Sequence, residues 1–88
     1  MATLAPVCRI RSITDKEELI VDLLFSVRDD LGNLLMLDAG FAIISLKSKQ
    51  ANWSYNVPMN IDSIRYEQEF ISCLENLCDF IRKQRGYE

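Results

Sequence analysis

The 88-residue sequence contains no histidine, and this absence limits the chemistry available to it. Histidine is the commonest general base and a frequent metal ligand, so many catalytic mechanisms lose a central group. The carboxylate pairs Glu17/Glu18 and Asp29/Asp30 lie in predicted turns, where acidic side chains are usually solvated. We therefore expect a protein that is not an enzyme and has no catalytic residues.

Glycine and proline are also scarce, with three and two residues. The motifs G-x-G-x-x-G and G-x-x-x-x-G-K-[ST], whose backbone cradles phosphates, do not occur. No linker, low-complexity segment or internal repeat is visible, so residues 1–88 are expected to form a single domain. No cofactor is predicted.

No hydrophobic run is long enough to cross a bilayer, which takes about 20 residues. The longest apolar stretch, residues 34–46, is interrupted by Asp38 and Gly40. Residues 1–8 lack the basic and apolar regions of a signal peptide. We expect a soluble, cytoplasmic protein that does not contact membranes.

The three cysteines, Cys8, Cys73 and Cys78, have neither the number nor the spacing of a disulfide framework or a metal site. Cys73 and Cys78 fall in one predicted helix, and their separation places them about 140° apart around its axis. No C-x-x-C pair is present. The cysteines are expected to be reduced and structural, as suits an intracellular compartment, and no metal is expected.

Apolar residues at spacings of three and four predict one C-terminal helix over about residues 61–85. Asn60 or Asp62 can cap its start, and Gly86 suits the left-handed residue that ends many helices. The apolar positions of this helix are Phe70, Cys73, Leu74, Leu77, Cys78 and Ile81.

Residues 7–57 show the period-two alternation of β-strands, with the first strand at about 7–13 and the last at 53–57. Asp38–Gly40 is either a second turn or a bulge in one long strand. The expected fold is α+β, an antiparallel meander of four to five strands followed by one helix packed on the sheet. The clearest alternating strand contains Leu19, Val21, Leu23, Phe25 and Val27.

The apolar pattern exceeds what one helix–sheet contact can bury. The apolar arc of the helix spans about 180°, against roughly 100° for a typical surface helix. Ile20 and Leu24 lie on the other side of their strand from the alternating set. One explanation is a closed small barrel whose interior takes the surplus. The other is a second contact surface, for another protein or another copy of the chain.

We favour the second contact surface, because a short chain without disulfides or a metal gains stability from a partner subunit. The expected function is a small acidic protein-interaction module, such as an inhibitor, adaptor or assembly subunit, that self-associates as a homodimer. The candidate partner-binding residues are Ile20, Leu24, Ile44, Phe70, Ile71, Leu74 and Cys78.

The helix stripe has two edges, and only one of them can face the sheet. The edge with Ile71, Leu74 and Cys78 is expected to face outwards. The opposite edge is bordered by acidic residues and is expected to pack on the sheet; it comprises Cys73, Leu77 and Phe80.

An uneven charge distribution leaves nucleic-acid binding as an alternative. Residues 1–14 and 39–60 each carry a net charge of +2, although the whole chain carries −3. The net acidity disfavours a large phosphate footprint. A further alternative is a small-molecule site at a dimer seam. The residues that could contact phosphates or stack on a ligand are Arg9, Arg11, Lys47, Lys49, Trp53 and Tyr55.

Overall fold

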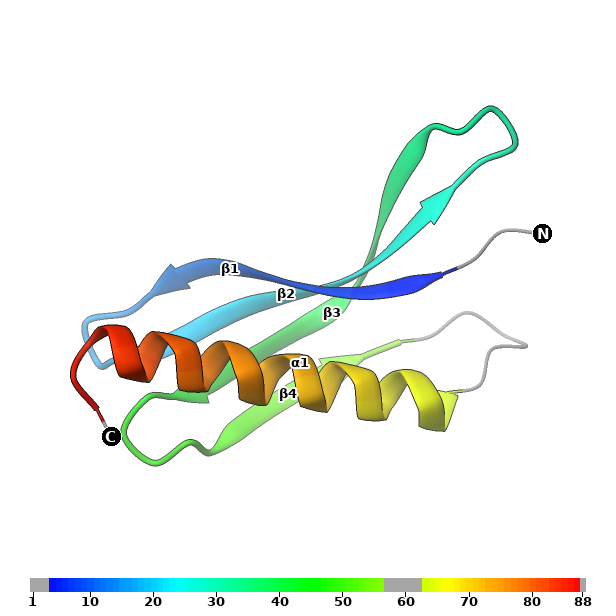
Figure 1. The fold of residues 1–88 in the computed structure, drawn as a ribbon. Coiled ribbons are helices and arrows are strands. Elements are labelled where there is room, and N and C mark those ends of the chain that lie inside the picture. The colour runs from blue at the N-terminus through cyan, green and yellow to red at the C-terminus, as the bar shows by residue number, and fades with distance from the viewer. Residues whose placement is uncertain (1–3, 57–62, 88) are drawn as a thin grey trace.

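A computed structural model of the chain describes residues 4–56 and 63–87 (Figure 1). The prediction of an α+β fold is confirmed, because a four-stranded antiparallel sheet is followed by one C-terminal helix. Val57 of the expected last strand and the expected caps Asn60 and Asp62 lie outside the described residues. The elements are β1 (Ala5–Ile13), β2 (Glu18–Arg28), β3 (Leu34–Ser45), β4 (Ala51–Tyr55) and α1 (Ser63–Gln84).

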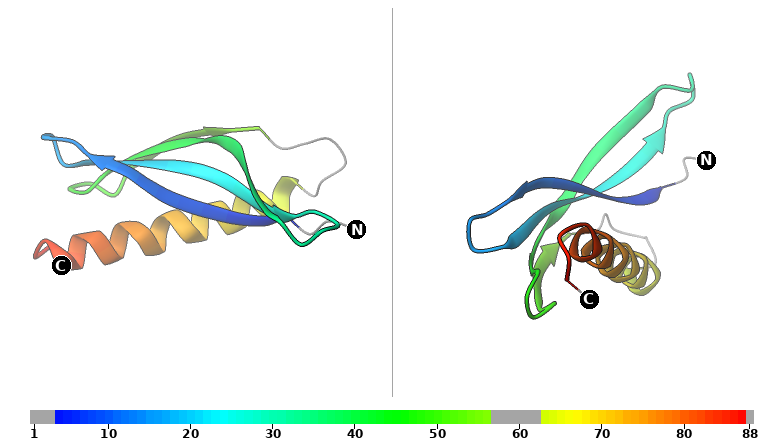
Figure 2. Two further views of the ribbon diagram at one scale, coloured as in Figure 1. Left: turned by 90° about the horizontal axis from the view of Figure 1, so that it is seen from above. Right: turned by 60° about the vertical axis from the view of Figure 1, so that its left-hand side comes forward.

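Strands that are neighbours in sequence pair in the sheet, in the order β1-β2-β3-β4. Among the described strands β1 and β4 are the two edges, so the sheet is open and the closed-barrel alternative is wrong. Helix α1 lies across one face of the sheet (Figures 1 and 2). The opposite face, called the open face below, has no described helix on it.

The core lies between α1 and the sheet, and the alternation in β2 selects which side chains enter it. The ring of Phe25 meets the rings of Tyr66 and Phe70 edge-on, each at a centroid distance of 5.3 Å. Buried core residues include Leu19, Val21, Leu23 and Phe25 of β2, Ala42 and Ile44 of β3, Leu46 after it, and Phe70, Leu74 and Cys78 of α1.

A β-bulge makes Asp38–Gly40 part of one long strand. Leu24 pairs with Asp38 and Leu23 with Gly40, which leaves Ala39 as the extra residue. A Cβ at position 40 would overlap the carbonyl oxygen of Ser54 and lie 2.7 Å from the Cα of Tyr55. Because the φ of Gly40 is also 152°, glycine is required where β4 packs against β3.

Beyond the bulge, β1 pairs with β2 as far as Ser26, and from Val27 and Leu35 to the turn β2 and β3 continue as a two-stranded hairpin that extends past the part of the sheet covered by α1 (Figures 1 and 2). We call residues 27–37 the arm. Asp29 stabilises its turn, because one carboxylate oxygen accepts hydrogen bonds from the N–H groups of Leu31 and Asn33 at 2.9 and 2.8 Å. Since bulges bend and twist a strand, the bulge at Ala39 explains why the arm diverges from the rest of the sheet.

Helix α1 ends in a Schellman motif, which confirms the expected role of Gly86. The N–H of Tyr87 donates to the carbonyl of Arg82 at 2.8 Å, and the N–H of Gly86 donates to that of Lys83 at 3.3 Å. Gly86 has a φ of 84°, which glycine adopts without strain. The Arg82 guanidinium also donates to the carbonyl of Leu46, which joins the end of the helix to the turn after β3.

Candidate functional site

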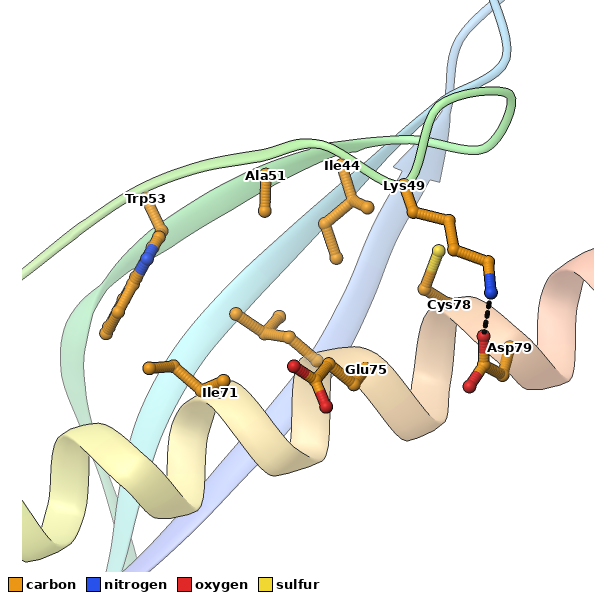
Figure 3. Close-up of a pocket in the computed structure, with 9 residues that line it drawn as sticks. Ile44, Lys49, Ala51, Trp53, Ile71, Glu75, Cys78 and Asp79 are labelled. Carbon is orange, nitrogen blue, oxygen red and sulfur yellow. Dashed lines mark ion pairs between the residues drawn. The ribbon is translucent and has the colours of Figure 1, made fainter.

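A groove of about 330 Å³ lies between α1 and the edge of the sheet formed by β3 and β4 (Figure 3). Trp53 and Ile71 lie at one end, and an ion pair closes the other, with the Lys49 Nζ 3.2 Å from a carboxylate oxygen of Asp79. The groove is therefore apolar along most of its length and charged at one end. Its lining comprises Ile44, Lys49, Ala51, Trp53, Ile71, Leu74, Glu75, Cys78 and Asp79.

Local structure fixes the charged end of this groove. Lys49 has a φ of 65° in the turn before β4, and its N–H donates to the Ser45 carbonyl at 2.9 Å. Asp79 is on the exposed side of α1, four residues after Glu75. Burial raises the pKa of the Cys78 thiol above its usual range, so this cysteine is a poor nucleophile. The groove can accept an apolar side chain or ring.

Most of the predicted partner-binding residues lie inside the helix–sheet core. Ile44, Phe70, Leu74 and Cys78 are buried in that core, and Leu24 is buried on the open face of the sheet. Two members of the set remain. Ile20 is half-buried on the open face, and Ile71 is exposed on α1, with 37% of its surface accessible. Their binding to a partner stays a prediction.

The expected orientation of the helix stripe is wrong. Leu74 and Cys78 pack against the sheet, whereas Phe80, expected to face the sheet, is 59% exposed. Of the other two residues of that edge, Leu77 packs partly buried against the core and the Cys73 thiol lies near Cys8 of β1, so only the Phe80 end of this edge faces away from the sheet. Because the apolar arc of α1 is wide, the residue spacing fits the packing of either edge on the sheet. The charged residues that border the arc did not identify the edge that packs there.

The residues of the nucleic-acid alternative are divided between the two faces of the sheet. Arg9 and Arg11 both pair with Asp22, and the Arg9 contact measures 3.5 Å between nitrogen and oxygen. The Arg11 hydrogen bond is the main reason why the pKa of Asp22 lies below its usual range. Trp53 and Tyr55 stack at a centroid distance of 5.0 Å on the helix side.

The remaining lysine of that set, Lys47, is 3.6 Å from Glu17 in the turn after β1. The Tyr55 ring also meets the ring of Phe70 at 5.4 Å, which joins the aromatic pair to the core. Arg9 and Arg11 therefore lie on the opposite face of the sheet from the aromatic pair, whereas Lys49 lines the same groove as Trp53; nucleic-acid binding stays a prediction.

The arm was missed as a candidate site by the sequence reasoning. Leu31 at its turn is 86% exposed, and Leu34, Leu35, Met36 and Leu37 are 56, 46, 43 and 43% exposed. The available signal was the run of four large apolar residues, which lacks the alternation of a strand with one wet face. Both faces of the arm are in fact exposed, because α1 does not reach it.

Comparisons with known proteins identify no relative: no protein-family model matches the chain, and no curated protein or solved structure matches it. Within the described ranges, no cluster of three or more potential metal ligands is found. The helical part of these ranges does not combine the length and the apolar character needed to cross a membrane.

Proposed function

We propose that the protein is a small acidic protein-interaction module, such as an inhibitor, adaptor or assembly subunit. It binds other polypeptide chains, including copies of itself, through apolar surface that α1 leaves uncovered. The observation that carries the proposal is the exposure of Leu31 and of Leu34–Leu37 on the arm. Monomeric soluble proteins rarely expose an apolar patch of this kind, and larger patches usually mark interaction sites.

Two other exposed aromatic residues support the same function. Phe41 is 46% accessible on the open face, and Phe80 is 59% accessible on the outer side of α1. These two residues lie on different sides of the molecule, and neither lies on the arm, so the chain offers apolar contacts in several directions. Single exposed apolar residues also occur on monomers, so these two support the proposal only together with the arm.

A second candidate function is the binding of a small apolar ligand in the groove beside Trp53. Its volume lies at the small end of the range for ligand pockets, about 300–1,000 Å³. A ligand ring could pack on Ile71 and Trp53 while a polar group reaches Lys49. Quenching of the fluorescence of Trp53, the single tryptophan, by added apolar ligands would detect such binding.

The main proposal is tested by comparing two variants with equal numbers of substitutions. The arm variant replaces Leu31, Leu34 and Met36 with serine. The other variant replaces Ile71 and Phe80 on α1 and Phe41 on the open face, also with serine. Proteins that the wild type retains from a native lysate should be lost with the arm variant and kept by the other variant. If both variants retain the same proteins as the wild type, the apolar surface is not the binding surface.

A further inference from the structure

The free strand edges of the sheet differ in how they are protected against pairing with another strand. On the outer side of β1, Pro6 lacks an N–H, Arg9 and Arg11 add charge, and the strand has a bulge between Ile10 and Ser12. The other outer strand, β4, is only five residues long. Proline, charge, bulges and short length are the devices by which native proteins block edge pairing.

The outer side of β3 in the arm is as short as β4 and has one charge, Asp38, beside the bulge at Ala39, but it is apolar up to that end. Strand β4 pairs with Gly40–Ile44, so no described residue pairs with the outer side of Leu34–Asp38. This segment contains no proline, and its first four residues are uncharged and apolar. An apolar, unpaired edge of this kind is a template for another strand.

Hydrogen-bond alternation identifies the backbone groups on this edge. In an antiparallel pair, successive residues point their N–H and C=O groups alternately towards the partner strand and away from it. The N–H of Asp29 donates to the carbonyl of Asn33 at 3.0 Å, which makes this a hydrogen-bonded pair. Counting from it, Leu35 and Leu37 bond to β2, so the backbone groups of Leu34, Met36 and Asp38 point outwards.

We propose that this edge pairs antiparallel with the same edge of a second copy, around a twofold axis at Met36. The free segment is bounded by the turn at Asn33 on one side and by Asn56 on the other, whose N–H donates to the Ala39 carbonyl at 2.8 Å. The second copy supplies a segment of the same length between the same boundaries. This inference rests on the self-association in the proposed function and names the surface that carries it.

This register matches both the backbone groups and the side chains. Leu34 lies opposite Asp38 and Met36 opposite Met36, so every outward-pointing residue meets another one. Leu35 lies opposite Leu37 on one face, which extends the apolar surface across the axis. The two Asp38 carboxylates are at opposite ends, about 13 Å apart along the strands, so the like charges do not meet.

The deciding variant is Met36→Pro, with Met36→Leu as its matched control. The N–H of Met36 points outwards, so proline removes a donor to the second copy without removing a hydrogen bond to β2. Sedimentation equilibrium should show a dissociation constant at least about tenfold higher for Met36→Pro and within about twofold of wild type for Met36→Leu. Circular dichroism checks that each variant retains its helix.

A second measurement uses only the wild type and does not depend on the folding of a variant. Amide hydrogen exchange at Leu34, Met36 and Asp38 should slow at least about tenfold between concentrations below and above the dissociation constant. A dimer whose exchange at these amides is unchanged by concentration overturns the assignment of this edge, while self-association itself stands. A chain that is monomeric at all concentrations overturns both the edge and self-association, and leaves the binding of a foreign partner to the capture experiment.

Discussion

Asp22 places a carboxylate on the open face of the sheet with only 8% of its surface exposed. Hydrogen bonding to Arg11, followed by the nearby charges of Arg11 and Arg9, lowers the pKa of Asp22 in the folded state. A lowered folded-state pKa means that the ionised carboxylate stabilises the fold at pH values above the unfolded pKa of about 3.9. This contribution is lost as the pH falls through the folded-state pKa.

We therefore predict that Asp22→Asn is less stable than the wild type at pH 7 and that the difference narrows below about pH 4. Urea unfolding at pH 7 and pH 3 measures the two free energies of unfolding. Asp15→Asn, at the exposed turn after β1 and away from the arm, is the control and should match the wild type within about 0.5 kcal/mol at pH 7. A difference for Asp22→Asn that is constant across pH would show that lost packing, and not lost charge, causes the effect.

The cysteines give a second prediction at the scale of single residues. All three are free, and burial raises the pKa of both Cys8 and Cys78; the nearby Cys73 thiol raises that of Cys8 further. Because the thiolate is the reactive form, Cys8 and Cys78 should be alkylated by iodoacetamide at pH 8 at least about tenfold more slowly in the native than in the unfolded protein. Peptide mass spectrometry after timed quenching measures each site. Equal rates in native protein and in guanidinium would contradict the packing described for both thiols.

Gly40 controls how two elements, β3 and β4, fit together. A side chain here meets strain from a positive φ and overlap with the backbone of β4, whereas Gly32 has a φ of 82° and open space around its Cβ position. Gly32→Ala should lower the free energy of unfolding by about 1–2 kcal/mol, the cost of a left-handed conformation alone. Gly40→Ala should cost more, because β4 must also shift. Chemical unfolding of both variants tests this, and equal losses would mean that β4 yields without cost.

The strand and helix patterns predicted the elements well where one face alone is buried. In β2, the alternation from Leu19 to Phe25 identified the side that packs on α1, and the Gly86 signal identified the end of the helix. The bulge at Ala39 could not be separated from a turn, because an extra residue and a reversal both interrupt the period of two. The side of α1 that packs on the sheet was also undetermined, since a wide apolar arc fits either orientation.

The arm shows a different limit of prediction from sequence. Leu34–Leu37 reads as a buried strand, because continuous apolar runs are typical of strands covered on both faces. The structure instead leaves this run exposed, because the hairpin extends past the part of the sheet that α1 covers. Whether a helix covers a strand depends on where that helix packs in the folded chain, and the local sequence of the strand does not contain this information.

At the scale of the whole molecule, the chain is elongated, with principal extents of 44, 24 and 19 Å. Helix α1 and the sheet bury one core, and the arm extends from it with its apolar side chains uncovered (Figure 2). A short chain buries a smaller fraction of its surface than a long one, so the proposed contact with a second copy would add stability that the core alone does not supply. Stability and self-association are therefore expected to rise together with protein concentration.

The net charge gives the prediction that tests this whole-molecule view. Each copy carries a net charge of −3, and two of its acidic residues, Asp29 and Asp30, lie in the turn of the arm near the proposed contact. Raising NaCl from 0.1 to 1 M shortens the screening length from about 10 to about 3 Å, so repulsion between copies falls and the dimer should tighten by about threefold or more.

Two charge-neutralising variants separate this repulsion from the general effect of salt on apolar contacts. Asp30→Asn and Glu75→Gln each remove one negative charge, but Glu75 is exposed on α1, away from the arm. In 0.1 M NaCl, Asp30→Asn should lower the dissociation constant and reduce its dependence on salt, whereas Glu75→Gln should change both much less, because its charge is on α1 and not on the arm. Sedimentation equilibrium at both salt concentrations gives the comparison. A dimer that weakens in salt, or that responds to Glu75→Gln as strongly as to Asp30→Asn, would place the contact on another surface of the molecule.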